Sequence, residues 1–452
     1  MEHSVEELKS LLVPGKTVHL VGIGGVSMRS LAPVFLGMGM SVTGSDRDES
    51  VSTQQLREQG VKIMIGHFPD NVLGADVVVR TAAVHDDNPE IMSARAYGIP
   101  VFERAQAWGV IMQAYRNAIC IAGTHGKTTV TSMVTHVMME AQKDPTVMIG
   151  GFLPLINACH RVGKGDTIIL EACEYTDSFL NFFPSISVIL NIEEDHLDYF
   201  RDLAHIQSSF RKFAQLASDR VLVNGDDLNS LKAVEGMDYV TFGFGQDNVV
   251  HAENICPDWQ HLDVVCDGNF YCHLDLHVMG KHNAHNAIAT AATAWVMGIP
   301  GEAVTRGLDS FFGAHRRMQF KGTYNGADLY DDFAHHPEEL KVTIEVVKTM
   351  GYKRFILAFQ PYTYTRTVSF FDDFVRELKA ADHLVLAEIC AARETDTLGI
   401  SSRHLQEKIP GSVYRETLPE VTEYLCSIAR EGDVILSSGC GDIYKAIDAM
   451  LK

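Results

Sequence analysis

The chain has 452 residues, of which 46% are hydrophobic and 21% charged, a composition that supports sizeable hydrophobic cores. At this length about three domains are expected, because one core would be too large. The formal net charge of −20 disfavours nucleic acid or an anionic membrane as a partner of the surface as a whole.

The N-terminal segment MEHSVEELKS lacks the basic region and the apolar run of a signal peptide. No window approaches the ~18 consecutive apolar residues of a membrane helix. The nine cysteines include no CxxC pair, and an odd number fits no complete set of disulfides. We therefore expect a cytoplasmic protein with reduced thiols and no membrane insertion.

Residues 17–102 alternate short apolar runs with amphipathic segments, the pattern of parallel strands joined by helices. The run TVHLV leads into GIGGVSM, residues 22–28, a glycine turn typical of dinucleotide-binding domains. Asp46 ends the second apolar run, where such domains carry a ribose-binding acid. The expected strands are TVHLV, SVTGS, VKIMI, DVVVR and IPVF.

A second strand–turn–helix unit, NAICIAGTHGKTTVTSMV, carries the strongest single motif. Backbone N–H groups at the start of its helix can surround a phosphate, Lys127 can neutralise it, and the Thr128 hydroxyl can coordinate Mg²⁺. The strict phosphate-loop pattern requires glycine where Ile121 stands, so the loop is a shortened variant. The alternative is a glycine-rich turn with an exposed lysine.

Acidic groups follow the next two apolar runs, DTIILEA and ISVILNI. Glu171 stands at the end of the first run and Glu174 follows it, and Asp195 and His196 follow the second. Because the carboxyl ends of parallel strands share one edge of a sheet, these groups are expected beside the phosphate loop, where they could hold a divalent ion. Taken singly, each group could equally be a solvated surface side chain.

The remainder of the chain continues the α/β pattern with one interruption. HLDVVCD and FYCHLDLHV alternate like half-exposed antiparallel strands, and AHNAIATAATAWVMGIP reads as a buried helix. The other expected strands are RVLVN, DLYDD, RFILAF, HLVLAEI and DVILSS.

Several motifs together resemble the Mur ligase family, the ATP-dependent amide-forming enzymes of peptidoglycan synthesis. They are GTHGKTT, EACE, NIEEDHLD, GKHNAHNA, HRRMQ, DDFAHHPEEL and FQPYTYTRT, and the resemblance extends from about residue 17 to about 445. It implies an α/β protein of three domains: a Rossmann-like UDP-sugar domain (1–106), a central P-loop-type ATPase domain of mixed α/β structure (107–313) and a Rossmann-like C-terminal domain (314–452) that holds the amino-acid site and closes the cleft.

The resemblance also implies a reaction. The carboxylate of UDP-N-acetylmuramate attacks the γ-phosphate of ATP to give an acyl phosphate and ADP, and the amine of L-alanine then displaces phosphate. ATP and Mg²⁺, as two ions, are the implied cofactors, and the protein is expected to be a monomer or a homodimer.

The resemblance assigns roles to particular positions. The catalytic residues implied are Lys127, Glu171, His196, His335 and Arg366, and the metal ligands are Thr128, Glu171 and His196. The implied ATP-binding residues are Gly123, Thr124, His125, Gly126, Lys127, Thr128, Thr129, His282, Asn283, Asn286, Arg317 and Asp332. The implied substrate-binding residues are Gly22, Gly24, Gly25, Val26, Ser27, Asp46, His67, Thr81, Ala82, His336 and Arg366. Arg316 and Arg317, beside the expected hinge into the last domain, are expected to reach phosphate in a closed state.

The sequence departs from the family pattern at a few positions. Tyr362 and Thr363 replace a His-Arg pair that the family often has, and Cys173 replaces an acid. Ser209 aligns with a lysine that several relatives carbamylate, as expected for the alanine-adding member of the family.

Three alternatives remain open. An NAD-dependent oxidoreductase would use the GIGGVSM turn, although Ser27 replaces the third glycine and the phosphate loop would then have no role. A sister ligase that recycles a tripeptide onto UDP-N-acetylmuramate would share the ATP chemistry. A non-catalytic binding protein would be expected to have lost the lysine or the acids.

Overall fold

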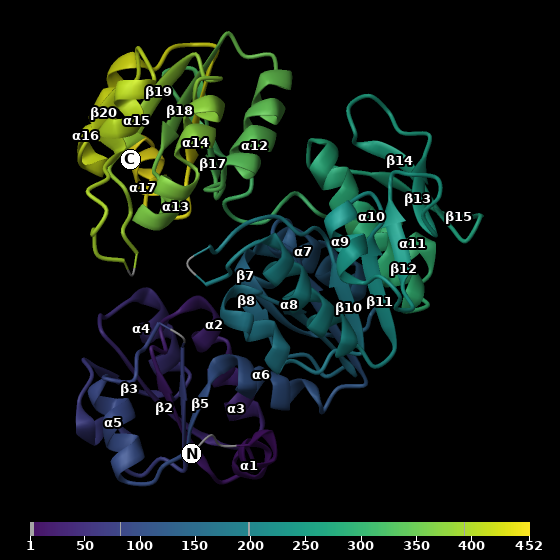
Figure 1. Ribbon diagram of the computed structural model, residues 1–452, viewed down its shortest axis with the longest axis vertical. Coiled ribbons are helices and arrows are strands. Elements are labelled where there is room, and N and C mark those ends of the chain that lie inside the picture. Colours follow the sequence, from purple (N-terminus) through teal and green to yellow (C-terminus); the bar gives the residue numbers. More distant parts are fainter. Residues whose placement is uncertain (1–3, 82, 198, 393) are drawn as a thin grey trace.

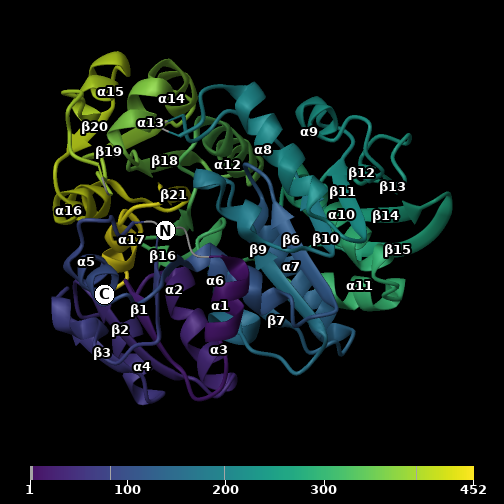
Figure 2. The ribbon, with the colours of Figure 1, turned by 60° about the horizontal axis from the view of Figure 1, so that its bottom comes forward.

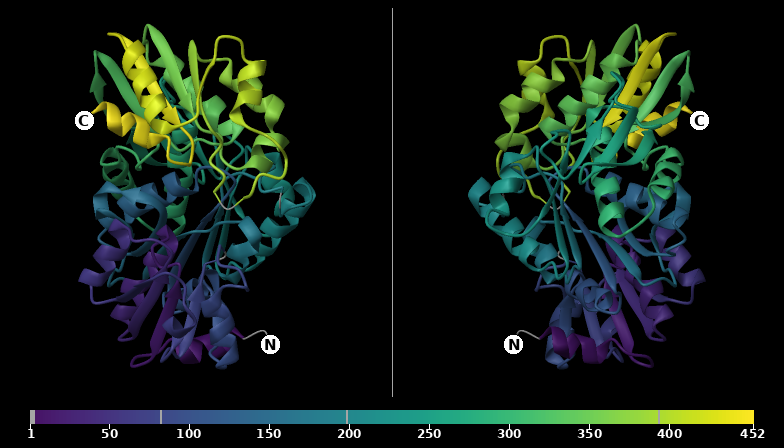
Figure 3. Two further views of the ribbon diagram at one scale, coloured as in Figure 1. Left: turned by 90° about the vertical axis from the view of Figure 1, so that its left-hand side faces the viewer. Right: turned by 90° about the vertical axis from the view of Figure 1, so that its right-hand side faces the viewer.

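The computed structural model describes residues 4–81, 83–197, 199–392 and 394–452. Three β-sheets follow one another along the long axis of the molecule, with the N-terminus in the first unit and the C-terminus in the last (Figures 1 and 3). The α/β class and the three-unit organisation predicted from the sequence are confirmed. Among the described residues, none of the helices is both long and apolar enough to span a membrane.

The first sheet is parallel, with strand order β3-β2-β1-β4-β5 and helices on both faces. Its middle strands are almost wholly buried, which explains why they appear in the sequence as continuous apolar runs. The strands are β1 (Thr17–Val21), β2 (Ser41–Asp46), β3 (Lys62–Ile65), β4 (Val77–Arg80) and β5 (Val101–Glu103). The helices are α1 (Val5–Leu11), α2 (Val26–Arg29), α3 (Leu31–Gly37), α4 (Val51–Glu58), α5 (Pro89–Ala96) and α6 (Arg104–Met112).

The second sheet has ten strands in the order β15-β14-β13-β12-β11-β10-β6-β9-β7-β8. Its centre is parallel, whereas β8, β14 and β15 at the two ends pair antiparallel. The strands are β6 (Asn117–Ala122), β7 (Thr146–Leu153), β8 (Ala158–Arg161), β9 (Thr167–Glu171), β10 (Ile186–Ile189), β11 (Arg220–Asn224), β12 (Val240–Gly243), β13 (Val250–Glu253), β14 (His261–Cys266) and β15 (Asn269–Asp275). The helices are α7 (Lys127–Glu140), α8 (Leu203–Gln215), α9 (Leu228–Ala233), α10 (Lys281–Val296) and α11 (Gly301–Asp309).

The third sheet has the order β16-β17-β21-β18-β19-β20, parallel except for β16. Its strands are β16 (Gln319–Tyr324), β17 (Ala327–Asp332), β18 (Arg354–Phe359), β19 (His383–Ala387), β20 (Val413–Arg415) and β21 (Asp433–Ser438). Its helices are α12 (Pro337–Thr349), α13 (Tyr364–Ser369), α14 (Phe371–Leu378), α15 (Ser402–Lys408), α16 (Leu418–Ile428) and α17 (Tyr444–Met450).

Every strand expected from the sequence is present, with ends that differ by a few residues. The expectation of an antiparallel interruption is also confirmed, in the hairpin of β14 and β15. Strands β7, β8, β12, β13, β16 and β20 were not predicted. Most of them are short, and β7 contains two adjacent glycines, so their sequences show little periodicity.

Helix α6 joins the first two units. It packs beside α1 and against the segment Tyr175–Asn181 of the second unit (Figure 2). The side chain of Trp108 is buried in a hydrophobic cluster that includes residues of both the first and the second sheet. The clusters of the third unit contain only residues beyond 317. The boundaries at 106/107 and 313/314 stay predictions, and α6 crosses the first of them.

Gly109 lies where α6 meets the second unit, and we expect Gly109→Ala to destabilise the protein. A Cβ at this position would lie 2.0 Å from the carbonyl oxygen of Asn181, so the helix must shift. Overpacking of this kind costs about 1–3 kcal/mol, which a lower thermal unfolding temperature would report. The control is Gly37→Ala in α3, where a Cβ meets nothing within 4 Å. Equal unfolding temperatures for the two variants would contradict the packing argument.

Candidate active site

The loop between β6 and α7 is held in an open turn by its glycines and by Asn191. Gly123 and Gly126 have φ angles of +152° and +84°, which favour glycine. At Gly126 a Cβ would also approach the Asn286 side-chain oxygen to 2.8 Å. The Asn191 side chain accepts from the N–H of His125 at 2.7 Å and donates to its carbonyl at 3.1 Å. The loop is therefore fixed before any ligand binds.

Lys127, the first residue of α7, is paired within the protein. Its ammonium lies 2.9 Å from a carboxylate oxygen of Glu174 and donates to the carbonyls of Gly123 and Thr124. Burial alone would lower the pKa of Lys127, but the neighbouring Glu174 carboxylate more than offsets this and raises it. Lys127 therefore carries a positive charge beside the loop between β6 and α7, which is called the nucleotide loop after its predicted role.

Thr128, the second residue of α7, contacts Glu171, the last residue of β9. The Thr128 hydroxyl lies 2.9 Å from a Glu171 carboxylate oxygen, which also accepts from the N–H of Gly150 at 2.7 Å. Hydroxyl and carboxylate oxygens are the hard ligands that Mg²⁺ prefers. The two side chains thus fit the metal-ligand role predicted for them.

His196 lies near Glu174 and has a left-handed backbone conformation, with φ of +53°. Its Nε2 lies 3.9 Å from Glu174, and its ring lies 4.6 Å from that of Tyr175. The adjacent Asp195 is buried and accepts from Arg366 of the third unit at 2.9 Å. Burial raises the pKa of Asp195, but the His196 and Arg366 charges outweigh it and hold that pKa well below its usual range. The predicted catalytic residues His196 and Arg366 therefore lie close together.

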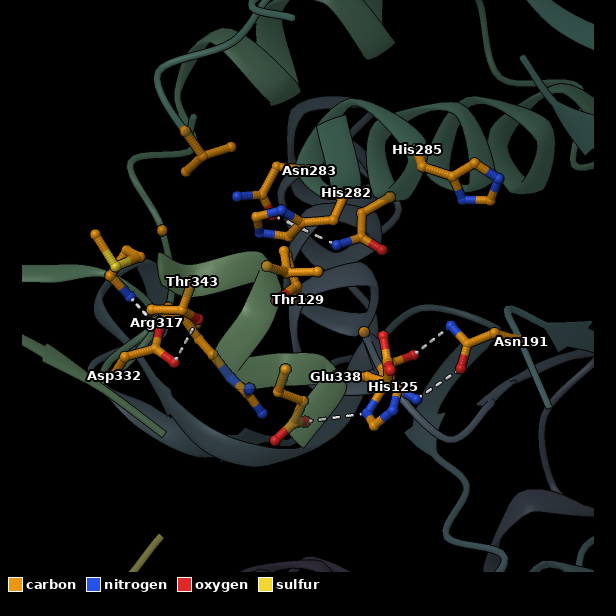
Figure 4. A pocket seen from close by; sticks show the side chains of 18 of the residues that line it. His125, Thr129, Asn191, His282, Asn283, His285, Arg317, Asp332, Glu338 and Thr343 are labelled. Carbon is orange, nitrogen blue, oxygen red and sulfur yellow. Dashed lines mark hydrogen bonds and ion pairs between the residues drawn. The ribbon is translucent and has the colours of Figure 1, made fainter. Parts of the chain in front are cut away.

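The residues predicted to bind ATP include several that line a pocket between α7, α10 and the third unit (Figure 4). Asn283 donates to the carbonyl of Met279 at 2.8 Å and lies 3.4 Å from Asn286. The Nδ1 atom of His282 is buried and has no hydrogen-bond partner among the described residues. Burial, together with the charge of Arg317, lowers the pKa of His282 to about 4. A neutral imidazole with a free nitrogen can recognise a polar group of a base.

The third unit closes the same pocket. Arg317 and Asp332 lie opposite His282 and His125 (Figure 4). The Asp332 carboxylate accepts from the N–H groups of Met318 and Ala334 at 2.7 and 2.8 Å, which fixes its orientation. All the other predicted ATP-binding residues belong to this pocket or to the loop above: His125, Gly126, Thr129, Asn283 and Asn286 line the pocket, and Gly123, Thr124, Lys127 and Thr128 form the loop.

His125 connects the loop to the third unit through two carboxylates. Its Nε2 lies 3.2 Å from Glu193 and its Nδ1 lies 3.2 Å from Glu339 on α12. Burial favours the neutral ring, but the two carboxylates outweigh it and raise the pKa of His125 to about 10. His336 caps α12 by accepting from the N–H of Glu338 and packs against His125.

His335 and His196 line the cavity that holds the nucleotide loop and also an adjoining pocket, which Tyr362, Thr363 and Arg366 line as well. Burial lowers the pKa of His335 to about 4, so its imidazole is neutral and can accept a hydrogen bond. His336, predicted as a substrate contact, packs on Phe370, which does line this pocket. His336 itself is not among the residues that line this pocket.

Arg316 is held by contacts of the third unit. Its guanidinium donates to the Asp331 carboxylate and to the carbonyls of Gly439 and Gly441. These bonds hold it inside the third unit, although it also lines the cavity that Arg317 lines, so a phosphate contact of Arg316 stays a prediction for the closed state. Ser209, at the position of the carbamylated lysine of some relatives, donates to Asp177.

The glycine turn of the first unit differs in detail from expectation. As predicted substrate-binding residues, Gly22, Gly24 and Gly25 would offer their backbone N–H groups to a ligand. In the structure they donate to the Ser45 carbonyl, the Asp46 carboxylate and the Gly22 carbonyl, respectively. Asp46, at the end of β2, closes the turn with a 2.8 Å hydrogen bond.

The remaining predicted substrate-binding residues of the first unit lie near the same edge of its sheet. Thr81 lies against Gly22, and His67 lies 3.4 Å from the buried Glu90. Val26 and Ser27 start α2. Ala82 lies outside the described residues.

All three units contribute to one cavity. Arg29 of the first unit lines it together with the nucleotide loop, Glu171, Glu174 and His196 of the second. Arg317 and His335 line it from the third unit. A ligand in this cavity can contact the phosphate loop, the acidic cluster and the third unit at once.

Sequence reasoning assigned no role to several charged or polar residues whose contacts shape the site. Among them are Arg29, Asn191, Glu193 and Glu339. Asn191 and Glu193 lie between β10 and Asp195, in the motif NIEEDHLD, and could have been found from that position. Glu339 belongs to the motif DDFAHHPEEL but was given no role, and Arg29 carries no comparable signal, because only the folded chain brings its helix to the cleft.

Comparison with known proteins agrees with this architecture. Three family models match in succession: the Mur ligase family catalytic domain over residues 17–116, the Mur ligase middle domain over 121–294 and the Mur ligase glutamate ligase domain over 316–441. The chain therefore belongs to the Mur ligase family.

Similar curated proteins bear one name. The UDP-N-acetylmuramate–L-alanine ligase of Caldanaerobacter subterraneus is 41% identical over 448 residues, covering 97% of each chain. The enzyme of the same name from Acetivibrio thermocellus is 41% identical and covers 99% of this chain and 98% of its own. The crystal structure of UDP-N-acetylmuramate–alanine ligase from Thermotoga maritima is 28% identical, with a TM-score of 0.82 over 96% of this chain and 98% of its own.

The raised pKa of His125 predicts a pH dependence of stability. The folded-state pKa of about 10 exceeds the ordinary value of 6.5, so the stabilisation is complete below about pH 6.5 and is lost as the pH rises towards 10. The loss is at most about 1.4 kcal/mol per pH unit. Thermal unfolding between pH 6.5 and 10 should therefore show a shallower decline for His125→Asn than for the unmodified protein.

The control is His85→Asn at an exposed position of the first unit, which should keep the steep decline. If His125→Asn declines as steeply as this control, the Glu193 and Glu339 contacts do not hold the proton on His125.

Proposed function

We propose that this chain joins L-alanine to UDP-N-acetylmuramate at the expense of ATP, which becomes ADP and phosphate. The observation that carries the proposal is the shared cavity, in which Lys127 and Thr128 of the nucleotide loop lie with Glu171, Glu174 and His196. The names of relatives 41% identical over nearly the whole chain support L-alanine as the amino acid.

The first step needs charge cancellation, because a carboxylate must attack an anionic phosphate. Lys127 supplies a fixed positive charge and, on ATP binding, exchanges the Glu174 carboxylate for the β- and γ-phosphates. Arg317 lies across the same cavity and adds a second cation from the third unit. The products of this step are ADP and the acyl phosphate.

Mg²⁺ would bind Thr128 and Glu171, with His196 and Glu174 offering ligands for a second ion. Such ions supply charge neutralisation at the phosphates and at the substrate carboxylate. Because Thr128 and Glu171 already contact each other through oxygen atoms, the metal site requires little rearrangement of the chain.

The second step places the amino acid between the second and third units. His335 is neutral and lies in one pocket with His196 and Arg366, so it can accept a hydrogen bond from the alanine amine and orient it for attack. Arg366 is already paired with Asp195, which holds it at the mouth of the acidic cluster. Arg366 would contact the anionic end of a substrate while it keeps its ion pair with Asp195.

The first unit is assigned the UDP-sugar. Asp46 and Thr81 gather with the glycine turn at the carboxyl edge of its sheet, where ligands of open α/β sheets bind. Arg29 extends this unit into the shared cavity. We assign residues 1–106 to the UDP-sugar, 107–313 to ATP, and 314–452 to the amino acid and to closure of the cleft.

A phosphate-release panel tests the specificity. With ATP, Mg²⁺ and UDP-N-acetylmuramate present, L-alanine should give rapid phosphate release and the tripeptide L-Ala-γ-D-Glu-meso-diaminopimelate should give little. Turnover with the tripeptide but not with alanine would assign the chain to the recycling ligases. NADH binding that UDP-N-acetylmuramate does not compete with would favour the oxidoreductase interpretation.

Lys127→Ala should abolish turnover while leaving UDP-N-acetylmuramate affinity within about twofold, because the sugar nucleotide is assigned to another unit. The expected loss is at least 10³-fold in kcat, comparable to removing a principal charge-stabilising group. Lys164→Ala, an exposed lysine of the same unit, serves as the control and should keep full activity. A parallel loss of UDP-sugar affinity in Lys127→Ala would argue against the domain assignment.

A further inference from the structure

The hairpin of β14 and β15 carries a second group of charged side chains, away from the cleft. It forms the outer edge of the ten-stranded sheet (Figure 1). His261 pairs across the hairpin with Asp275, and Asp263 pairs with His273. Alternate residues of a strand share a face, so these four side chains form a square on one face while Leu262 and Leu274 are buried on the other.

Three of these side chains converge on a point. The Oδ1 atom of Asp275 lies 2.7 Å from Nδ1 of His261 and 3.2 Å from Nε2 of His273. Ligand atoms of the three residues all lie within 4.8 Å of one another. A tetrahedral zinc ion with bond lengths near 2.1 Å separates its ligands by roughly 3.4 Å, so only a small expansion is needed to admit one.

The far nitrogens of both histidines also face carboxylates. Nδ1 of His273 lies 2.6 Å from Asp263, and Nε2 of His261 lies 3.8 Å from Asp258. A carboxylate behind a metal-binding imidazole fixes the ring orientation and strengthens its nitrogen as a ligand. A simple cross-strand ion pair needs one carboxylate per histidine, whereas this cluster provides each histidine with one in front and one behind.

The backbone that carries the cluster is anchored on both strands. Gln260, just before β14, exchanges two hydrogen bonds with Leu276, just after β15, at 2.7 and 2.8 Å. The carbonyl of His273 accepts from the Thr305 hydroxyl on α11 at 2.6 Å. The ligands are thus held in register before a cation arrives.

We propose that His261, His273 and Asp275 form a transition-metal site for Zn²⁺, separate from the ligase chemistry and independent of the proposed function. Two imidazole nitrogens and one carboxylate oxygen select zinc over Mg²⁺ or Ca²⁺, which prefer oxygen ligands alone. The fourth position is open to water, since both imidazoles are about half exposed, at 50% and 51%. The bound ion replaces two hydrogen bonds by coordinate bonds and clamps the edge of the sheet.

The test is Zn²⁺ binding to the full-length, metal-stripped chain by titration calorimetry with Mg²⁺ in excess to occupy the cleft. Thermal unfolding without metal identifies any variant that has lost its fold. His261→Ala and His273→Ala should each lose one bound Zn²⁺ per chain relative to the unmodified protein. Asp263→Asn should keep the ion but bind it about 10- to 100-fold more weakly, because it removes only the carboxylate behind His273.

His277→Ala is the matched control, since His277 follows the same strand, is exposed and pairs with Asp309 outside the cluster. It should keep the full number of bound ions. Equal zinc binding by His273→Ala and the unmodified chain would overturn the proposal, and so would an equal loss in His277→Ala.

Discussion

The ion pair between Lys127 and Glu174 is the interaction around which the cleft is organised. The Lys127 side chain is 14% exposed and that of Glu174 is 3% exposed. A charge this well buried requires a partner of opposite sign. Without Glu174 the nucleotide loop would hold an unpaired cation, and without Lys127 the acidic cluster would repel itself. In the free protein the charges of Lys127 and Glu174 thus balance each other. On binding, phosphate can replace Glu174 as the partner of Lys127, and a metal ion can replace Lys127 as the partner of Glu174.

The interface between the second and third units is polar, whereas the interface between the first and second units is apolar. Helix α6 places Trp108 in a core shared by the first two sheets. Against the third unit, by contrast, the cleft presents the ion pairs of Asp195 with Arg366 and of His125 with Glu339. Apolar burial resists separation in water, whereas ion pairs exchange readily with ligands and salt. This polar contact is consistent with the proposal that the third unit closes the cleft when charged ligands bind.

Much of this molecule could be predicted from its sequence. The buried parallel strands appear as apolar runs, and the carboxyl-edge rule brings Lys127, Glu171 and His196 to one place. The short strands β12 and β20 lack that signal because they are too brief to show a period. Contacts such as His125 with Glu339 depend on how two units dock, and nothing local in either segment encodes this. The internal hydrogen bonds of the glycine turn likewise depend on where Ser45 and Asp46 come to lie.

The confinement of the third unit's core clusters to its own residues has a consequence for protein engineering. A chain cut near residue 314 would expose charged and histidine-rich surface at the cut more than interior packing. Exchange of the last 140 or so residues between family members should then preserve each folding unit. The exchanged segment must keep Arg366 and Glu339, which pair with Asp195 and His125 of the second unit. The first two units, which share one core, must be transplanted together.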